Sequence, residues 1–179
     1  GENIKDAAGL CRIIGISHSI IYINDLVKDF EKLEWQSKIA KMNTASRIRA
    51  VILYHYANTH SALVIGTSNK TEIMLGYFTK YGDGAVDIEV IGSLFKTDEL
   101  ELARYLKIPE KIIKKTPTAE LYHGQTDEAE LGATYKEIDE ILAKIEKKQK
   151  LPNSALAKKI LKRIKDNEHK RNVPFVVKL

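Results

Sequence analysis

The stretch ALVIGTSNKTEIMLGYFTKYGDGAVD, residues 62–87, passes from an apolar run directly into glycines and charged side chains. Its first five residues, ALVIG, form a short apolar run, and SIIYI at residues 19–23 forms another. Helical patterns alternate with both runs. This alternation is typical of a parallel sheet that helices cover on both faces. We therefore predict an α/β fold built on a doubly wound parallel sheet.

The rest of the chain reads mainly as helices. Thr134 and Glu137 have the spacing of a capping box, and Ser154 follows Pro152 at the start of a basic helix. Apolar spacing and capping residues predict helices over residues 3–15, 25–33, 43–60, 69–75, 97–106, 134–145 and from 154 onward, and a final strand over 173–177. The polar loop between residues 116 and 134 has the length of a functional lid.

Composition restricts the class of protein. The 179 residues are 44% hydrophobic and 30% charged, which is typical of one globular domain. No apolar run approaches the ~20 residues of a membrane span, and we expect no signal peptide. Cys11 is the single cysteine, so a disulfide framework within the chain is excluded and a reducing cytoplasm is the expected compartment.

Positive charge is concentrated near the end of the chain. The net charge is +5 and the pI about 9.1, which favours anionic partners such as nucleotides, phosphorylated metabolites or nucleic acid. Residues 144–171 hold 11 Lys or Arg and 3 Asp or Glu, a net charge of +8. This segment fits either a solvated helix face or a surface that faces phosphate.

The polar residues after the second apolar run suggest a ligand site. Ligands of open parallel sheets bind beyond the carboxyl ends of the strands. Thr67 lies near a helix N-terminus, where backbone N–H groups favour phosphate, and Glu72 is a hard oxygen ligand of the type that Mg²⁺ prefers. Lys80 and Lys96 could neutralise phosphate oxygens. The alternatives are that Thr67 only caps the helix and that Glu72 is a solvated helix residue.

An ordered series of motifs identifies the family. GTSNKTEIMLGYFTKYGDGAVD at residues 66–87 is followed by IGSLFKTDELELARYL at 91–106, PTAEL at 117–121, GQTDEAELG at 124–132 and EHKR at 168–171. The series resembles the ammonia-dependent NAD synthetases, from the first helix to Arg171. These belong to the N-type ATP pyrophosphatases, so the resemblance implies a flavodoxin-like sheet of the adenine nucleotide alpha hydrolase type and a tight homodimer.

The resemblance implies a reaction as well. In this family, ATP and ammonia convert deamido-NAD to NAD, with AMP and pyrophosphate released through an acyl-adenylate. The substrate carboxylate is the nucleophile, so no catalytic nucleophile is expected in the protein; fixed cations and Mg²⁺ stabilise the charge that develops. The loop from Thr118 to Gly132 is the candidate lid against water, with Gln125 and Asp127 expected to be exposed on it.

The roles of individual residues also come from the resemblance. Residues that match each motif are expected to contact the same ligand as in the family. They are Arg47, Lys80, Asp87, His169 and Lys170 for deamido-NAD, Thr67, Lys96 and Thr118 for ATP, and Glu72 for Mg²⁺.

One family motif is absent from the sequence. The family's phosphate loop, Ser-Gly-Gly-x-Asp-Ser, does not occur, and the chain has no Gly-Gly pair. We expect that loop upstream of Gly1, so that residues 1–179 are a single domain forming the C-terminal part of a longer enzyme and are inactive without it.

Two other functions stay open from the residues alone. One is a different N-type ATP pyrophosphatase that amidates another carboxylate or modifies tRNA; the other is a non-catalytic fragment that binds nucleotide. The KYGDG, GQTDE and HKR motifs argue against the first of these, because the resemblance places them in the deamido-NAD site. We expect free ammonia as the nitrogen donor, since 179 residues leave no room for an amidase domain. Neither membrane nor nucleic acid is an expected partner.

Overall fold

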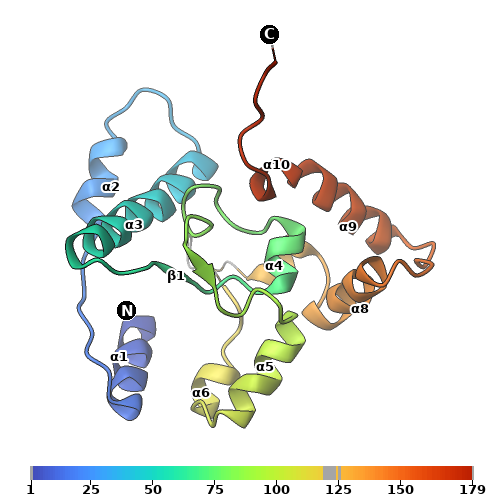
Figure 1. The fold of residues 1–179 in the computed structure, drawn as a ribbon, viewed down its shortest axis with the longest axis horizontal. Helices are drawn as coiled ribbons and strands as arrows, with labels where there is room; N and C mark the ends of the chain where they lie inside the picture. Colours follow the sequence, from blue (N-terminus) through green and yellow to red (C-terminus); the bar gives the residue numbers. More distant parts are fainter. Residues whose placement is uncertain (1, 119–123, 125, 179) are drawn as a thin grey trace.

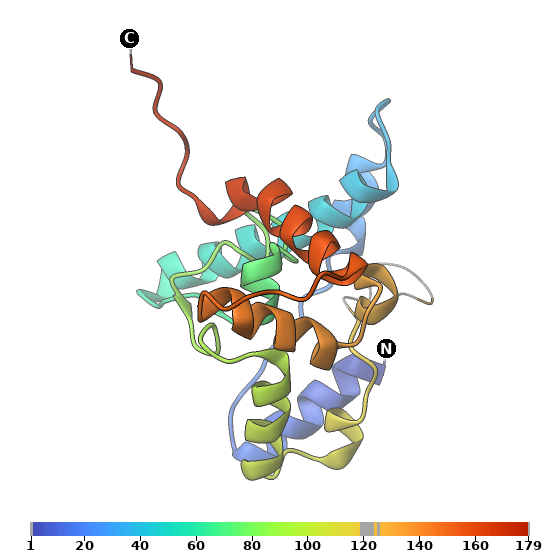
Figure 2. The ribbon, with the colours of Figure 1, turned by 90° about the vertical axis from the view of Figure 1, so that its right-hand side faces the viewer.

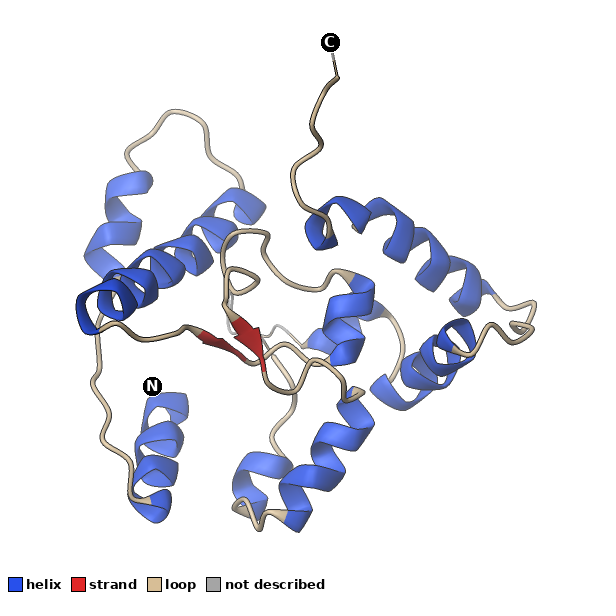
Figure 3. Cartoon of the chain, viewed as in Figure 1, coloured by secondary structure: helices blue, strands red, loops and turns tan. Residues whose placement is uncertain are grey.

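Helices surround a small central sheet in the computed structural model, which describes residues 2–118, 124 and 126–178 (Figures 1 and 3). The helices are α1 (Glu2–Ile14), α2 (Asn24–Phe30), α3 (Lys38–His60), α4 (Lys70–Leu75), α5 (Lys96–Tyr105), α6 (Glu110–Ile113), α7 (Asp127–Leu131), α8 (Tyr135–Glu146), α9 (Ala155–Asp166) and α10 (Glu168–Arg171). The strands are β1 (Ile65–Gly66) and β2 (Ile88–Glu89).

The sheet is parallel, with α4 in the connection between its strands. Ile65 pairs with Ile88 and Gly66 with Glu89. A parallel pair needs a crossover connection, and the segment containing α4 supplies it. The prediction of parallel strands alternating with helices is thus confirmed in this coarser form, although only two short strands are described.

Two predicted strands do not form. Residues 19–23 and 173–177 are fully described, and neither run is a strand. Ile21 is 61% exposed and Phe175 is 90% exposed, and Figure 1 shows the C-terminal segment leaving the body of the molecule. A strand satisfies its backbone groups through a neighbouring strand, and among the described residues neither run has one. Both predictions were made from apolar β-branched composition, which cannot supply that partner.

Helix starts follow local capping. The side chains of Asn69, Thr134 and Ser154 cap α4, α8 and α9, and Glu137 completes the predicted capping box of α8. The longest helix, α3, begins five residues before its predicted start because Ser37 accepts a hydrogen bond from the Ala40 backbone N–H. The short helices α6, α7 and α10 were not predicted.

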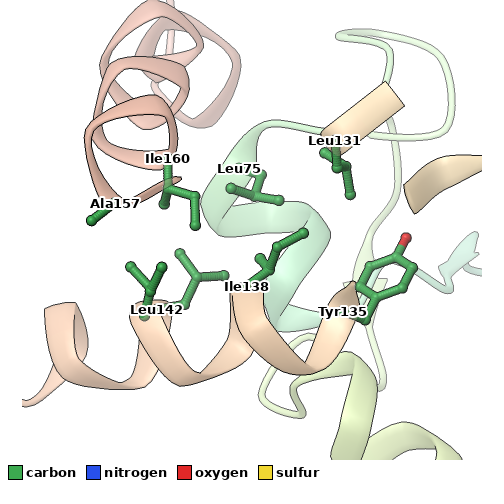
Figure 4. Packing of buried hydrophobic residues seen from close by; sticks show 8 residues of the cluster. Leu75, Leu131, Tyr135, Ile138, Leu142, Ala157 and Ile160 are labelled. Atoms are coloured by element: carbon green, nitrogen blue, oxygen red, sulfur yellow. The ribbon is translucent and has the colours of Figure 1, made fainter. Parts of the chain in front are cut away.

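The main core lies where α4 and α7 meet α8 and α9 (Figure 4). Leu75 from α4 is 1% exposed, and Ile138 and Leu142 from α8 are 1% and 0% exposed. Ala157 and Ile160 of α9 close the cluster, and α9 lies above α8 in Figure 2. This packing fixes α4 at the carboxyl end of β1.

The first helix is attached differently. Lys111 and Lys115 of the α6 region pair with Asp6 of α1 at 2.9 and 3.0 Å, and Lys111 also reaches Glu2. Ion pairs at the protein surface contribute little to stability, so α1 is weakly held by these contacts. None of the described helices combines the length and apolar character needed to cross a bilayer.

Truncation of the core tests this packing. We expect Leu142→Ala to lower the free energy of unfolding by about 2–5 kcal/mol, because it removes a fully buried side chain between α4 and α9. The matched change Leu161→Ala, on the exposed face of α9, is expected to cost less than about 1 kcal/mol. Urea unfolding followed by circular dichroism measures both values, and equal losses would contradict the assignment of the core.

Candidate functional site

The carboxyl end of β1 is a tight turn of polar backbone. Gly66 is buried, and a Cβ atom there would lie 2.4 Å from a carboxylate oxygen of Glu89. That carboxylate accepts a hydrogen bond from the Ser68 backbone N–H at 2.9 Å, and burial raises its pKa. Thr67, between the buried residues Gly66 and Ser68, is exposed and therefore accessible to a ligand.

The start of α4 buries a predicted metal ligand. Asn69 accepts from the Glu72 backbone N–H at 2.9 Å, and the Glu72 carboxylate accepts from the Asn69 backbone N–H at 3.1 Å. The Asn69 side chain is 1% exposed and donates to Glu99 at 2.8 Å. Glu72 is partly buried in this arrangement. The alternative that it is a solvated helix residue is therefore wrong.

Lys96 lies among the carboxylates near the start of α4. Lys96 Nζ is 3.0 Å from one oxygen of Glu99 and 3.1 Å from the other, and it lies 5.8 Å from the centre of the Tyr135 ring. Burial raises the pKa of Glu72 to about 7; Lys96 opposes the rise, while the charges of Glu99 and Asp127 add to it. The structure therefore brings Lys96, expected to contact ATP, close to Glu72, expected to hold Mg²⁺.

Two tyrosines extend this carboxylate group. The Tyr77 hydroxyl is 2.6 Å from Glu130 and 3.2 Å from Asp127, and Tyr135 donates to Asp127 at 2.9 Å. Burial, and then the neighbouring carboxylates, raise the pKa of both hydroxyl groups. Asp127 is only 7% exposed, so the expectation of an exposed Asp127 on a lid is wrong. Its sequence spacing to Tyr77 gave no signal of this contact.

A second group gathers residues expected to contact deamido-NAD. Arg47 Nε donates to the Lys80 carbonyl at 3.3 Å, and Lys80 Nζ donates to the His169 carbonyl. Lys170 Nζ donates to the carbonyls of residues 76 and 78 at 2.8 Å each. Burial and the nearby Arg163 lower the pKa of Lys170. Four of the five predicted residues thus lie around the loop after α4.

The remaining predicted residues are placed differently. Asp87 accepts from the Val64 backbone N–H at 2.7 Å and from the Tyr54 hydroxyl at 3.2 Å, so it ties β2 to β1 and α3. Thr118 is partly buried at the edge of the described segment. Gln125 lies outside the described residues.

A cavity of about 590 Å³ adjoins both groups. Thr67 lines it from the end of β1, Lys170 from α10, and Glu130 from α7. Sequence reasoning missed two further cations on its wall, Arg49 and Arg163. The Nε atom of Arg163 is buried without a hydrogen-bond partner in the part of the chain that the structure describes.

The donor set fits a weakly chelated Mg²⁺ rather than a protein-built metal centre. Among the described residues, no group of three or more His, Cys, Asp or Glu side chains is arranged to hold a metal. Mg²⁺ bound with a nucleotide commonly uses one or two carboxylates, phosphate oxygens and water. Glu72 fits this role because burial, and then the charges of Glu99 and Asp127, raise its pKa, and a bound cation would stabilise its charged form.

Comparisons with known proteins agree on one family. The family model described as NAD synthase matches residues 1–174. The NH(3)-dependent NAD(+) synthetase of Archaeoglobus fulgidus is 44% identical over 179 residues, which are 99% of this chain and 72% of that protein. A structure of NMN synthetase from Francisella tularensis has a TM-score of 0.90 and 36% identity, covering 99% of this chain and 74% of that one.

A second solved structure gives the same result. The NH3-dependent NAD synthetase from Campylobacter jejuni, in complex with the nitrate ion, has a TM-score of 0.84 and 34% identity and covers 99% of this chain and 73% of that one.

The raised pKa of Glu72 predicts a pH-dependent stability. A carboxyl group whose pKa is about 7 when folded and about 4.3 when unfolded destabilises the fold as pH rises through that interval. We expect Glu72→Gln, which keeps the acceptor of the capping box, to stabilise the metal-free protein by on the order of 2 kcal/mol at pH 8 and by little at pH 4.5.

Thermal melts in EDTA at the two pH values measure this difference. The matched control is Glu101→Gln, an exposed glutamate of α5, which should show no pH-dependent gain. The same gain at both pH values for Glu72→Gln would contradict a buried, proton-linked carboxyl.

Proposed function

The chain belongs to the NAD synthase family and has the function of an ammonia-dependent NAD synthetase, a ligase, and from this premise we propose how its residues divide the work. Glu72, Lys96, Thr67 and Thr118 serve the ATP and Mg²⁺ side of the site. Arg47, Lys80, Asp87, His169 and Lys170 serve the deamido-NAD side.

The observation that best supports these roles is the proximity of Glu72 and Lys96 at the carboxyl end of β1. There the partly buried Glu72 and Lys96 interact electrostatically, at the mouth of the only parallel strand pair in the described residues. Parallel sheets place ligands at this end. The nucleotide side also connects to the cavity, because Tyr77 and Glu130 line it while Tyr77 contacts Asp127.

The proposed reaction has two steps. The nicotinate carboxylate of deamido-NAD attacks the α-phosphate of ATP, and the bond to the β-phosphate breaks to release pyrophosphate. Ammonia then attacks the acyl carbon, AMP leaves, and a proton is lost to give the amide of NAD. Lys96 offsets charge on the departing phosphates, and Lys80 and Lys170 supply positive charge beside the dinucleotide.

The proposal includes Mg²⁺ and a closed site. When bound at Glu72, Mg²⁺ supplies charge neutralisation at the phosphates. The segment from residue 118 to 132, of which residues 119–123 and 125 lie outside the described part of the chain, is the proposed lid that excludes water, since water would hydrolyse the acyl-adenylate. Support for the inner end of this segment comes from α7, whose Asp127 and Leu131 are buried.

We also propose a single domain that works as a homodimer in the cytoplasm, with its sheet extended to the doubly wound flavodoxin-like form. Apolar side chains on the outside of α3 support association, since Ile39, Val51 and Tyr56 are 70%, 69% and 60% exposed. Ile21 and Ile65, 61% and 58% exposed, support a wider sheet.

The ATP side is tested at Lys96. We expect Lys96→Met to raise the KM for ATP by about tenfold or more and to lower kcat, because an ammonium group near the phosphates is replaced by an apolar group of similar length. Formation of NAD from deamido-NAD, ATP and ammonium is followed by chromatography, for this and the other kinetic tests in an enzyme that also carries the family's phosphate loop. The control is Lys158→Met on the exposed face of α9, which is expected to behave as wild type.

The deamido-NAD side is tested at Lys80. We expect Lys80→Met to raise the KM for deamido-NAD by about tenfold and to change the KM for ATP by less than about twofold. A parallel assay with nicotinate mononucleotide, the carboxylate that corresponds to NMN, separates the two substrate classes. Faster turnover of the mononucleotide than of deamido-NAD would reject the proposed substrate.

A further inference from the structure

A buried carboxylate on α8 lies behind the nucleotide side of the site. Asp139 is 5% exposed and accepts three hydrogen bonds. Its Oδ1 accepts from the Thr71 hydroxyl at 2.5 Å, and its Oδ2 accepts from the backbone N–H and the hydroxyl of Thr97 at 2.9 Å each. The resemblance assigned neither Asp139 nor Thr71 to a ligand, although Thr71 lies within the motif at residues 66–87.

The Thr71 hydroxyl links this carboxylate to Lys96. Thr71 is 0% exposed, and its Oγ1 accepts from the Lys96 backbone N–H at 2.9 Å while its proton goes to Asp139. Both hydrogen-bonding functions of the hydroxyl are therefore used in fixed directions. A hydroxyl donates one proton and accepts through its lone pairs, so no apolar side chain of the same shape can replace it.

These bonds hold the first turn of α5 from outside the helix. Helix N-termini leave backbone N–H groups without intrahelical partners, and a side chain just before the helix usually satisfies one of them. The residue at that position is Phe95, whose side chain has no such oxygen. Thr71 and Asp139 satisfy the N–H groups of Lys96 and Thr97 instead.

The link ties the two proposed ligand residues together. Thr71 precedes Glu72 in the first turn of α4, and Lys96 is the first residue of α5. We propose that Thr71 and Asp139 are positioning residues that set the Lys96 ammonium relative to the Glu72 carboxylate, so that both meet one Mg²⁺–ATP. This inference rests on the proposed function.

A purely structural role would give a different result. If the Thr71–Asp139 contact only stabilised the fold, its loss would lower stability and leave the affinity of the folded protein for each substrate unchanged. In a positioning role, α5 can shift against α4, and the loss appears in the KM for ATP. Since Lys80 and Lys170 are held by separate contacts, the KM for deamido-NAD stays constant.

The decisive comparison is Thr71→Val against Thr71→Ser. Valine keeps the shape and removes the hydroxyl, whereas serine keeps the hydroxyl. We expect Thr71→Val to raise the KM for Mg²⁺–ATP, and the Mg²⁺ concentration for half-maximal rate, by about tenfold. Thr71→Ser is expected to stay within about twofold of wild type, and both variants to keep the KM for deamido-NAD. An unchanged KM for Mg²⁺–ATP in a folded Thr71→Val protein overturns the inference.

Two further variants cover a failure of Thr71→Val to fold. Asp139→Asn can still accept from the Thr97 N–H through its carbonyl oxygen while its amide faces Thr71, so it weakens the Thr71 link selectively. It should reproduce the Thr71→Val result. Ser154→Ala removes the cap of α9 and should lower the melting temperature by ~2–4 °C without changing either KM. An effect of Ser154→Ala on the KM for ATP equal to that of Asp139→Asn overturns the inference.

Comparison with Lys96→Met separates this inference from the proposed function. If Lys96→Met raises the KM for ATP and Thr71→Val does not, the positioning role is rejected and the proposed function stands. If Lys96→Met leaves the KM for ATP unchanged, the assignment of Lys96 fails and the positioning role fails with it.

Discussion

The burial of α4 is the constraint on which the rest of the molecule depends. Six residues are too few to form a stable helix in water, because one or two turns do not offset the cost of nucleation. This helix exists because Leu75 packs against α8 and α9, and because Asn69 caps its first turn. Its position in turn determines where β1 ends, where Glu72 lies and where the loop to β2 begins. The packing that forms the core therefore also positions the residues of the site.

Local chemistry explains which parts of the fold were readable from the sequence. Thr134 with Glu137, and Ser154 before α9, act within three residues of themselves, so their caps were predicted correctly. A strand depends on a neighbour that its own sequence does not contain, and for this reason residues 19–23 and 173–177 were mispredicted. The short β2 strand was missed because two residues carry no periodicity.

The same limit applies to the site. The chemistry of Thr67 and Glu72 suggested an anionic ligand with a metal, but only the resemblance named the ligands. The structure groups Arg47, Lys80 and His169, which are far apart in sequence, and it buries Asp127, which the sequence suggested was exposed. Contacts such as Tyr77 with Asp127 span 50 residues, and no spacing rule reaches that far.

Burial shifts the pKa of the two sides of the site in ways that link ligand binding to protons. It raises the pKa of Glu72 and lowers that of Lys170, so burial disfavours the charged form of each group. A cation bound at Glu72 and an anion bound near Lys170 would each oppose this effect of burial. Charge in the site is completed by the ligands.

The contact of Gly66 with Glu89 has an evolutionary consequence. Any Cβ atom at residue 66 would displace the carboxylate that receives the Ser68 N–H, and removal of that carboxylate would leave the N–H group without its acceptor. A substitution at either position alone therefore disturbs the hydrogen bond to the Ser68 N–H, so the residues that suit one position depend on the residue at the other. Residues 66 and 89 should accordingly drift as a correlated pair across related sequences.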